Sequence, residues 1–144
     1  MKRNPQTRER LLDAAEQLFL EKGFQGTSTR DITEAAGANL AAVNYHFRSK
    51  QDLMVAVAER VVAPILRDQV SRLDELQGRA APPTVAELVS AYVTPMVEQR
   101  ERRGGEQIAR FIGQSMYEDF ESVRRVVDPV EGRFRAALAG VARV

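Results

Sequence analysis

The segment from residue 27 to residue 47, TSTRDITEAAGANLAAVNYHF, constrains the fold more than any other part of this chain. Gly37 lies near its centre, and a residue without a Cβ enters the left-handed turn between two helices with the least strain. Asn39 is well placed to cap a second helix, because its side-chain oxygen can accept a hydrogen bond from a free backbone N–H. The segment therefore predicts two short helices joined by a tight glycine turn.

The two helices have predictable faces. We place the first N-cap at Thr29, with Thr27 and Ser28 as alternatives, and the inward residues of the following helix are then Ile32, Ala35 and Ala36. In the second helix Val43 and Phe47 are four residues apart and should face the first helix, which leaves three residues facing outward: Leu40, Ala41 and Asn44. A helix that presents small and amide side chains in this way has the shape of a reading head for the major groove of DNA.

The flanking residues extend this pattern. An apolar stripe over Leu11, Ala15, Leu18 and Phe19 predicts an earlier helix that ends near Gly23, and a further helix should begin at a Ser49 cap with Asp52 beside it. The net charge is only +1, so the placement of charge matters more than its total. Acidic Glu16, Glu21 and Glu34 are expected on faces turned away from the head, around which six basic residues are expected: Lys2, Arg3, Arg8, Arg30, Arg48 and Lys50.

The run LFLEKGFQGTSTRDITEAAGANLAAVNYHFRSKQDLM resembles the DNA-binding domain of the tetracycline-repressor (TetR) family of bacterial transcriptional regulators. The resemblance covers roughly residues 7–60. It includes the Phe and Gly that close the first helix, Thr-Ser-Thr-Arg, the Ala-Ala-Gly turn, Tyr-His-Phe and Ser-Lys-x-x-Leu, in the expected order and spacing. The resemblance implies a homodimer that binds a palindromic operator in double-stranded DNA, usually represses a nearby gene, and is released by a small molecule.

The resemblance also implies roles for single residues. Leu40, Ala41 and Asn44 should approach base edges, Arg30 should reach a guanine, and phosphates should be held by Thr29, Asn39, Tyr45, His46 and Lys50. The chemistry agrees in part, since Asn pairs with adenine, Arg pairs with guanine, and apolar side chains contact the thymine methyl group. Many relatives carry Lys, Gly and Tyr at the positions of Leu40, Ala41 and Asn44, so their operator sequences do not transfer to this chain.

Structural roles compete with these assignments. Tyr45 and Phe47 could both be core aromatics, and for Phe47 this is the role we expect. His46 near a helix end could act only as a favourable partner of the helix dipole, and Lys50 in a first helical turn could be solvated surface.

Composition narrows the class of protein. With 144 residues, 44% of them hydrophobic, the chain can bury the core of one or two small helical units. It has no cysteine and one histidine, which predicts no disulfide, metal site or other cofactor. No nucleophile elbow, phosphate-binding glycine loop or His-Glu-x-x-His motif is present, so an enzyme is not expected. No apolar run approaches the ~20 residues of a membrane span, and a cytoplasmic location is predicted.

Beyond residue 49 the sequence predicts further helices and no strand. One runs from Lys50 to about Leu76 with Pro64 inside it, and the next begins at a Thr84–Glu87 capping box and contains Pro95. Gly104 and Gly105 precede another, and a last helical segment should begin at Asp128-Pro129. The predicted fold is therefore all-α, with a helix-turn-helix domain at 1–49 and a helical effector-binding and dimerisation domain at 50–144.

A pocket is predicted in the second domain, because prolines inside neighbouring helices can spread them apart. The candidate ligand-binding residues are Tyr92, Met96, Phe111, Ile112, Met116 and Tyr117, for which ordinary core packing is the alternative. Their apolar character indicates a small hydrophobic effector.

The C-terminal end departs from the family pattern. Members usually finish with two further helices that pair with the same two helices of a second subunit, and this sequence stops at Val144 before they appear. The sequence leaves open whether the chain is a fragment or dimerises differently, and a dimer is still predicted. Two functional alternatives remain, a helical protein-interaction module and a constitutive DNA-binding regulator without an effector.

Overall fold

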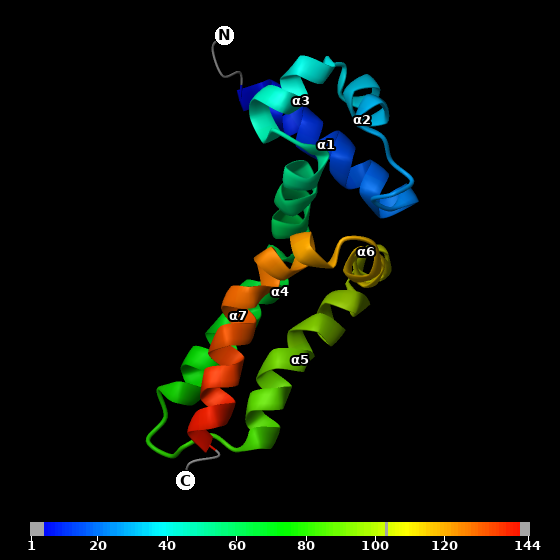
Figure 1. Ribbon diagram of the computed structural model, residues 1–144. Coiled ribbons are helices and arrows are strands. Elements are labelled where there is room, and N and C mark those ends of the chain that lie inside the picture. Colours follow the sequence, from blue (N-terminus) through cyan, green and yellow to red (C-terminus); the bar gives the residue numbers. More distant parts are fainter. Residues whose placement is uncertain (1–4, 103, 142–144) are drawn as a thin grey trace.

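The structure, a computed structural model, describes residues 5–102 and 104–141. In these ranges the chain forms seven helices and no strand: α1 (Pro5–Lys22), α2 (Thr29–Ala36), α3 (Leu40–Phe47), α4 (Lys50–Gln77), α5 (Val85–Glu101), α6 (Gly105–Glu118) and α7 (Phe120–Val141). Figure 1 shows α1, α2 and α3 as a head at one end and the remaining helices as an elongated body. The all-α prediction is confirmed, while Lys2, Arg3 and Val144 lie outside the described residues.

Ser28, rather than Thr29, caps α2. The Ser28 hydroxyl oxygen accepts a hydrogen bond from the Asp31 N–H at 3.0 Å, and the Asp31 carboxylate accepts one from the Ser28 N–H at 2.7 Å. The prediction of Thr29 as the cap is wrong, because Asp31 lies three residues after Ser28 and completes a capping box only with that residue. The hydrogen bonds from Ser28 also hold the pKa of Asp31 below its ordinary value.

The inward face of α2 differs from the prediction at one position. Ile32 and Ala36 are buried as expected, but Ala35 is exposed and Thr33 is buried in its place. Burial of Thr33 is tolerated because its hydroxyl donates to the Arg30 carbonyl at 2.9 Å. Gly37 ends the helix in the left-handed conformation, with a φ of 59°, as the sequence predicted.

A single hydrophobic core joins the head to the body. Val43 and Phe47 of α3 are buried as predicted, and they share a cluster with Leu53 and Val57 of α4 and Phe111 of α6. Farther down, α4 packs against both α5 and α7, and a second buried cluster closes the far end of the body: Leu73, Leu76, Leu88 and Ala91. α4 therefore contributes to both clusters and connects the head to the far end of the body.

The last helix begins earlier than the sequence indicated. α7 runs without a break from Phe120 through Pro129, so the prediction of a separate segment from Asp128 is wrong. The break lies at Asp119, whose carboxylate accepts hydrogen bonds from the Ser122 hydroxyl at 2.6 Å and, more weakly, from the Ser122 N–H at 3.4 Å. Val123, Val126 and Val130 continue a buried stripe past the proline, and this packing offsets the lost backbone hydrogen bond.

The start of α5 follows the predicted capping box. The Thr84 hydroxyl oxygen accepts from the Glu87 N–H, and the Glu87 carboxylate accepts from the Thr84 N–H at 2.8 Å. Pro95 is buried inside α5, and Pro64 lies exposed inside α4. None of the helices in the described residues combines the length and apolar character that a bilayer crossing requires.

Candidate nucleic-acid interface

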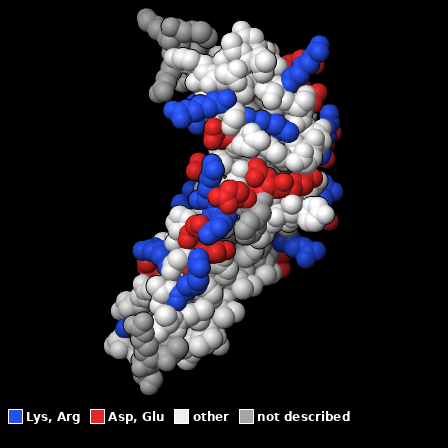
Figure 2. Space-filling model, in the orientation of Figure 1, with Lys and Arg blue, Asp and Glu red and all other residues white. Residues whose placement is uncertain are grey.

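The outer face of α3 is a small surface of apolar and amide groups. Leu40 is 56% exposed and Ala41 and Asn44 are also exposed, whereas Val43 and Phe47 on the opposite side are buried. The Asn39 side-chain oxygen accepts from the Ala42 N–H at 2.9 Å and fixes the start of the helix. Since α3 contains no Lys, Arg, Asp or Glu, the top of the head is largely white in Figure 2. The structure thus brings the three predicted base-contacting residues together on one outward face.

Arg30 and Thr29 lie at the start of α2. Thr29 is half-buried, and Arg30 extends into solvent with an ion pair to Glu34 at 2.9 Å. Glu34 therefore does not lie on a face turned away from the basic residues. An exposed pair one helical turn apart contributes little free energy, so Arg30 can exchange Glu34 for another anionic partner.

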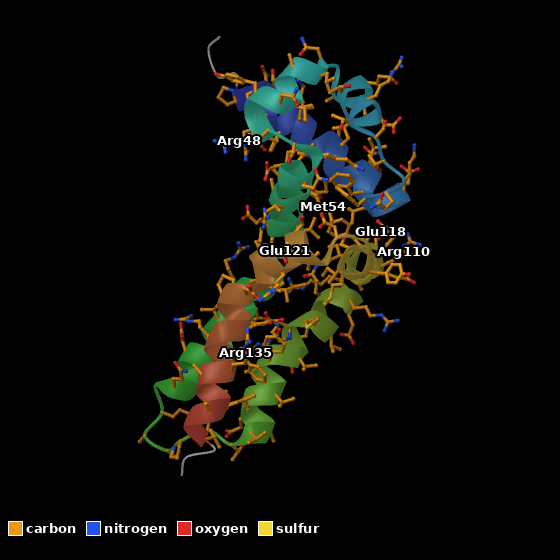
Figure 3. The ribbon with its side chains drawn as sticks, viewed as in Figure 1. Arg48, Met54, Arg110, Glu118, Glu121 and Arg135 are labelled. Atoms are coloured by element: carbon orange, nitrogen blue, oxygen red, sulfur yellow. The ribbon has the colours of Figure 1, made fainter. Side chains whose placement is uncertain are left out.

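Aromatic and basic side chains surround the end of α3. Tyr45 is 43% exposed and meets the half-buried His46 edge-on, with 5.0 Å between the ring centroids. The Arg8 guanidinium lies 5.0 Å from the centroid of the Phe47 ring. Arg48 follows α3 with a positive φ of 64°, in a tight turn where the Ser49 N–H donates to the Phe47 carbonyl at 2.7 Å, and its side chain points away from the core (Figure 3).

Lys50 lies at a junction between helices instead of on the outer face of α3. Its Nζ donates to the Phe24 carbonyl at 2.6 Å and is 4.0 Å from the centroid of the Phe24 ring. Burial lowers the pKa of Lys50, and the charges of Glu118 and Asp31 partly oppose that shift. In this arrangement the Lys50 ammonium already has a hydrogen-bond acceptor within the protein.

Glu118 completes the same junction from the body. One carboxylate oxygen accepts from the Phe24 N–H at 3.0 Å and from the Gln25 N–H at 3.2 Å, and the other accepts from the Gln114 amide at 2.9 Å. Figure 3 shows Glu118 where α6 meets the end of α1. A Cβ at Gly23 would collide with the Gln114 amide nitrogen, so the glycine leaves room for this contact. Sequence reasoning missed Glu118, because no local pattern pairs residues 94 positions apart.

Arg60 forms a second link between α4 and the head. Its guanidinium lies 2.8 Å from the Asp13 carboxylate, and its Nε donates to Glu16 at 2.6 Å. Glu9 lies farther away, at 3.7 Å. Both partners within hydrogen-bonding range belong to α1, so α1 is attached to the body through Arg60 as well as through the Glu118 junction.

The body contains a small apolar cavity of about 60 Å³ that opens to solvent between α4, α5, α6 and α7. Four predicted ligand-binding residues line it: Tyr92, Met96, Phe111 and Ile112. The other two do not, since Met116 is 47% exposed and Tyr117 is 92% exposed on the outer side of α6. Gln69 also lines the cavity and was missed, although it fills the four-residue spacing between Ile65 and Leu73 on the inward side of α4.

Known proteins share this head. Residues 11–57 match the family described as "Bacterial regulatory proteins, tetR family". YttP of Bacillus subtilis (strain 168), named a probable HTH-type transcriptional regulator, is 25% identical over 121 residues, which are 84% of this chain and 56% of YttP. The HTH-type transcriptional regulator AcrR of Shigella flexneri is 39% identical over 54 residues, 38% of this chain and 25% of AcrR. Residues 11–57 of this chain are therefore a TetR-family domain.

Solved structures extend the likeness beyond the TetR-family head. The multidrug binding protein EbrR complexed with imidazole aligns with a TM-score of 0.65 and 25% identity over 94% of this chain and 69% of EbrR. PfmR, a TetR family transcriptional regulator from Thermus thermophilus, aligns with a TM-score of 0.54 and 22% identity over 93% of this chain and 69% of PfmR, and shows the fold alone. A helical body with the same fold as in these structures therefore follows the head here too. The chain spans about half of YttP and a quarter of AcrR.

Proposed function

We propose that this chain acts as a cytoplasmic DNA-binding transcriptional regulator, which by family likeness is a repressor. The observation that carries the proposal is that α3 is buried on one side only. Its inner residues pack in the core, while Leu40, Ala41 and Asn44 are exposed. A helix held from behind in this way can enter the major groove without rearrangement. The names of YttP and AcrR as transcriptional regulators support the same reading.

In this proposal the outer face of α3 reads sequence and its rim binds the backbone. Asn44 pairs with a base edge, and Leu40 and Ala41 contact thymine methyl groups. Arg30 leaves Glu34 to reach a guanine. Phosphates are held by Thr29, Asn39, Tyr45 and His46. Lys50 joins them only when its ammonium leaves the Phe24 carbonyl.

Base reading is tested with matched amide variants. A duplex selected from a random library by the unaltered chain is compared with a scrambled duplex. Asn44→Ala should reduce the affinity ratio between the two duplexes about tenfold, because one bidentate base contact contributes about 1–3 kcal/mol. Gln17→Ala removes an exposed amide from α1 of the same head and should leave the ratio unchanged. Equal losses on both duplexes in Asn44→Ala would show that Asn44 does not read bases.

A protein-interaction module is the second candidate, because Leu40 and Tyr45 are exposed large hydrophobic residues on α3. Salt distinguishes the two functions. An α3 surface that binds DNA with help from several phosphate contacts should lose affinity steeply as the salt concentration rises. An apolar protein interface should not show that dependence.

The regulator is proposed to act as a homodimer on a palindromic operator. One head covers about half of a site, and two heads about 34 Å apart contact successive turns on one side of the duplex. Titration of the selected duplex, followed by analytical ultracentrifugation, should give two chains per operator. A saturated complex with one chain would contradict this part of the proposal.

A small hydrophobic effector is proposed to bind in the cavity and release the DNA. Phe111 and Ile112 of α6 line the cavity, and Glu118 lies seven residues after Phe111, about 10 Å along the same helix. A ligand that displaces α6 or α4 would therefore disturb the contacts of Glu118 or Lys50 with the head. If it binds the displaced form about a hundredfold more tightly, the coupling is roughly 2.7 kcal/mol.

Effector control is tested by titrating candidate ligands against the complex with the selected duplex. DNA affinity should fall as the cavity fills. An unchanged DNA affinity at saturating bound ligand would instead indicate a constitutive regulator.

A further inference from the structure

Gln69 brings an amide into a cavity whose other lining residues are aliphatic side chains, a methionine and the aromatic rings of Tyr92 and Phe111. It is 3% exposed, and its neighbours in the lining include Ile65, Leu66 and Val126. Its side-chain Nε2 donates to the Tyr92 carbonyl at 2.7 Å. Tyr92 lies three residues before Pro95 in α5. In this turn of the helix the proline ring disturbs the backbone hydrogen bonds.

The bond to Tyr92 fixes the orientation of the Gln69 amide. A carbonyl can only accept, so Nε2 must face it and the amide oxygen Oε1 must point elsewhere. Within the described residues, Oε1 accepts no hydrogen bond, and no side-chain oxygen is both unpartnered and fully enclosed. Oε1 therefore keeps some open surface, and the cavity is the open space that Gln69 lines.

An acceptor in this position selects among ligands. A molecule without a hydrogen-bond donor would displace water from Oε1 and leave it unsatisfied, which typically weakens binding about tenfold. A donor on an otherwise apolar molecule would satisfy it. The Tyr92 ring, stacked on Phe134 with 4.6 Å between centroids, gives the same wall of the cavity a flat aromatic surface.

We infer that the cavity takes a flat apolar molecule carrying one hydrogen-bond donor, and that Gln69 is the residue that selects for the donor. This inference rests on the effector-binding part of the proposed function and adds the chemical class of the ligand. It does not depend on whether α3 reads DNA.

Two probes of nearly equal shape test the inference on the 144-residue chain without DNA. Indole carries an N–H donor, and indene replaces it with a CH₂ group. Calorimetry should show indole binding about tenfold more tightly than indene. Gln69→Met keeps a flexible side chain of similar length but removes the acceptor, and should bring the two affinities together. Ile112→Val, which alters the apolar lining only, should weaken both probes alike and preserve their ratio.

Three results would overturn the inference: equal affinities of the unaltered chain for the two probes, a ratio that persists in Gln69→Met, or no binding of either probe up to its solubility. Retained indene binding in Gln69→Met shows that the variant has folded, and Gln69→Leu serves in its place if it has not. Because no DNA is present, failure here leaves α3 as a DNA reader untouched, and failure of DNA binding leaves this result standing.

Discussion

Replacing Glu118 with alanine should loosen the junction between α6 and the turn after α1. The change removes the acceptor for the Phe24 and Gln25 N–H groups, which lie 3.0 and 3.2 Å from the same carboxylate oxygen. A hydrogen bond to a charged group typically contributes about 1.5–3 kcal/mol. Because the bond to Gln25 is exposed to solvent, we count the pair as about 2 kcal/mol, equivalent to roughly thirtyfold in a local opening equilibrium.

Amide hydrogen exchange followed by NMR measures this opening directly. In Glu118→Ala, protection of the Phe24 amide should fall about thirtyfold, while that of Leu88, buried at the far end of the body, should not change. Glu101→Ala is the matched control, because Glu101 is also the last residue of its helix but makes no side-chain hydrogen bond among the described residues. The selected duplex should bind Glu118→Ala more weakly, since a loosened head must be ordered on the DNA.

Unchanged exchange at Phe24 in Glu118→Ala would refute this reasoning. It would mean that the carboxylate does not hold the turn in solution, and that α6 cannot act on the head through this contact. An equal loss of protection in Glu101→Ala would refute it as well, because the effect would then reflect general destabilisation.

Three further predictions concern the fold. Gly37→Ala should lower the free energy of unfolding, measured by urea titration, by about 1 kcal/mol. The left-handed φ of 59° strains an alanine, but the added Cβ would meet no atom within 4 Å. A loss of several kcal/mol would instead indicate a steric clash. Phe47→Ala should cost about 3–5 kcal/mol in the same assay, and a near-neutral result would contradict its core position. The Glu87 carboxyl should titrate below its ordinary pKa of 4.5, because the Thr84 N–H and hydroxyl donate to it. The stabilisation of the folded state by this carboxylate is then present above pH 4.5 and is lost as the pH falls through the folded pKa. An NMR titration midpoint at or above 4.5 would contradict this.

The helix-turn-helix could be predicted from the sequence because it depends on interactions between residues close together in the chain. Gly37, Asn39 and the Thr84–Glu87 capping box are found where they were predicted, because each acts on backbone groups within three or four residues. The outward position of Asn44 follows in the same way from helical spacing against Val43 and Phe47. Errors arose where two local signals competed, as at Ser28 and Thr29, or where packing outweighed a helix-start signal, as at Pro129.

The sequence by itself thus determined the all-α fold, the reading head and which side of α3 faces outward, since these depend on neighbours along the chain. Only the tertiary structure decided that Lys50 is held by Phe24, that Glu118 joins the body to the head, and that Gln69 binds the Tyr92 carbonyl beside an apolar cavity. Each of these contacts joins side chains to backbone groups more than twenty positions away. Which partners meet at such distances depends on how the helices pack, and helical periodicity carries no information about that.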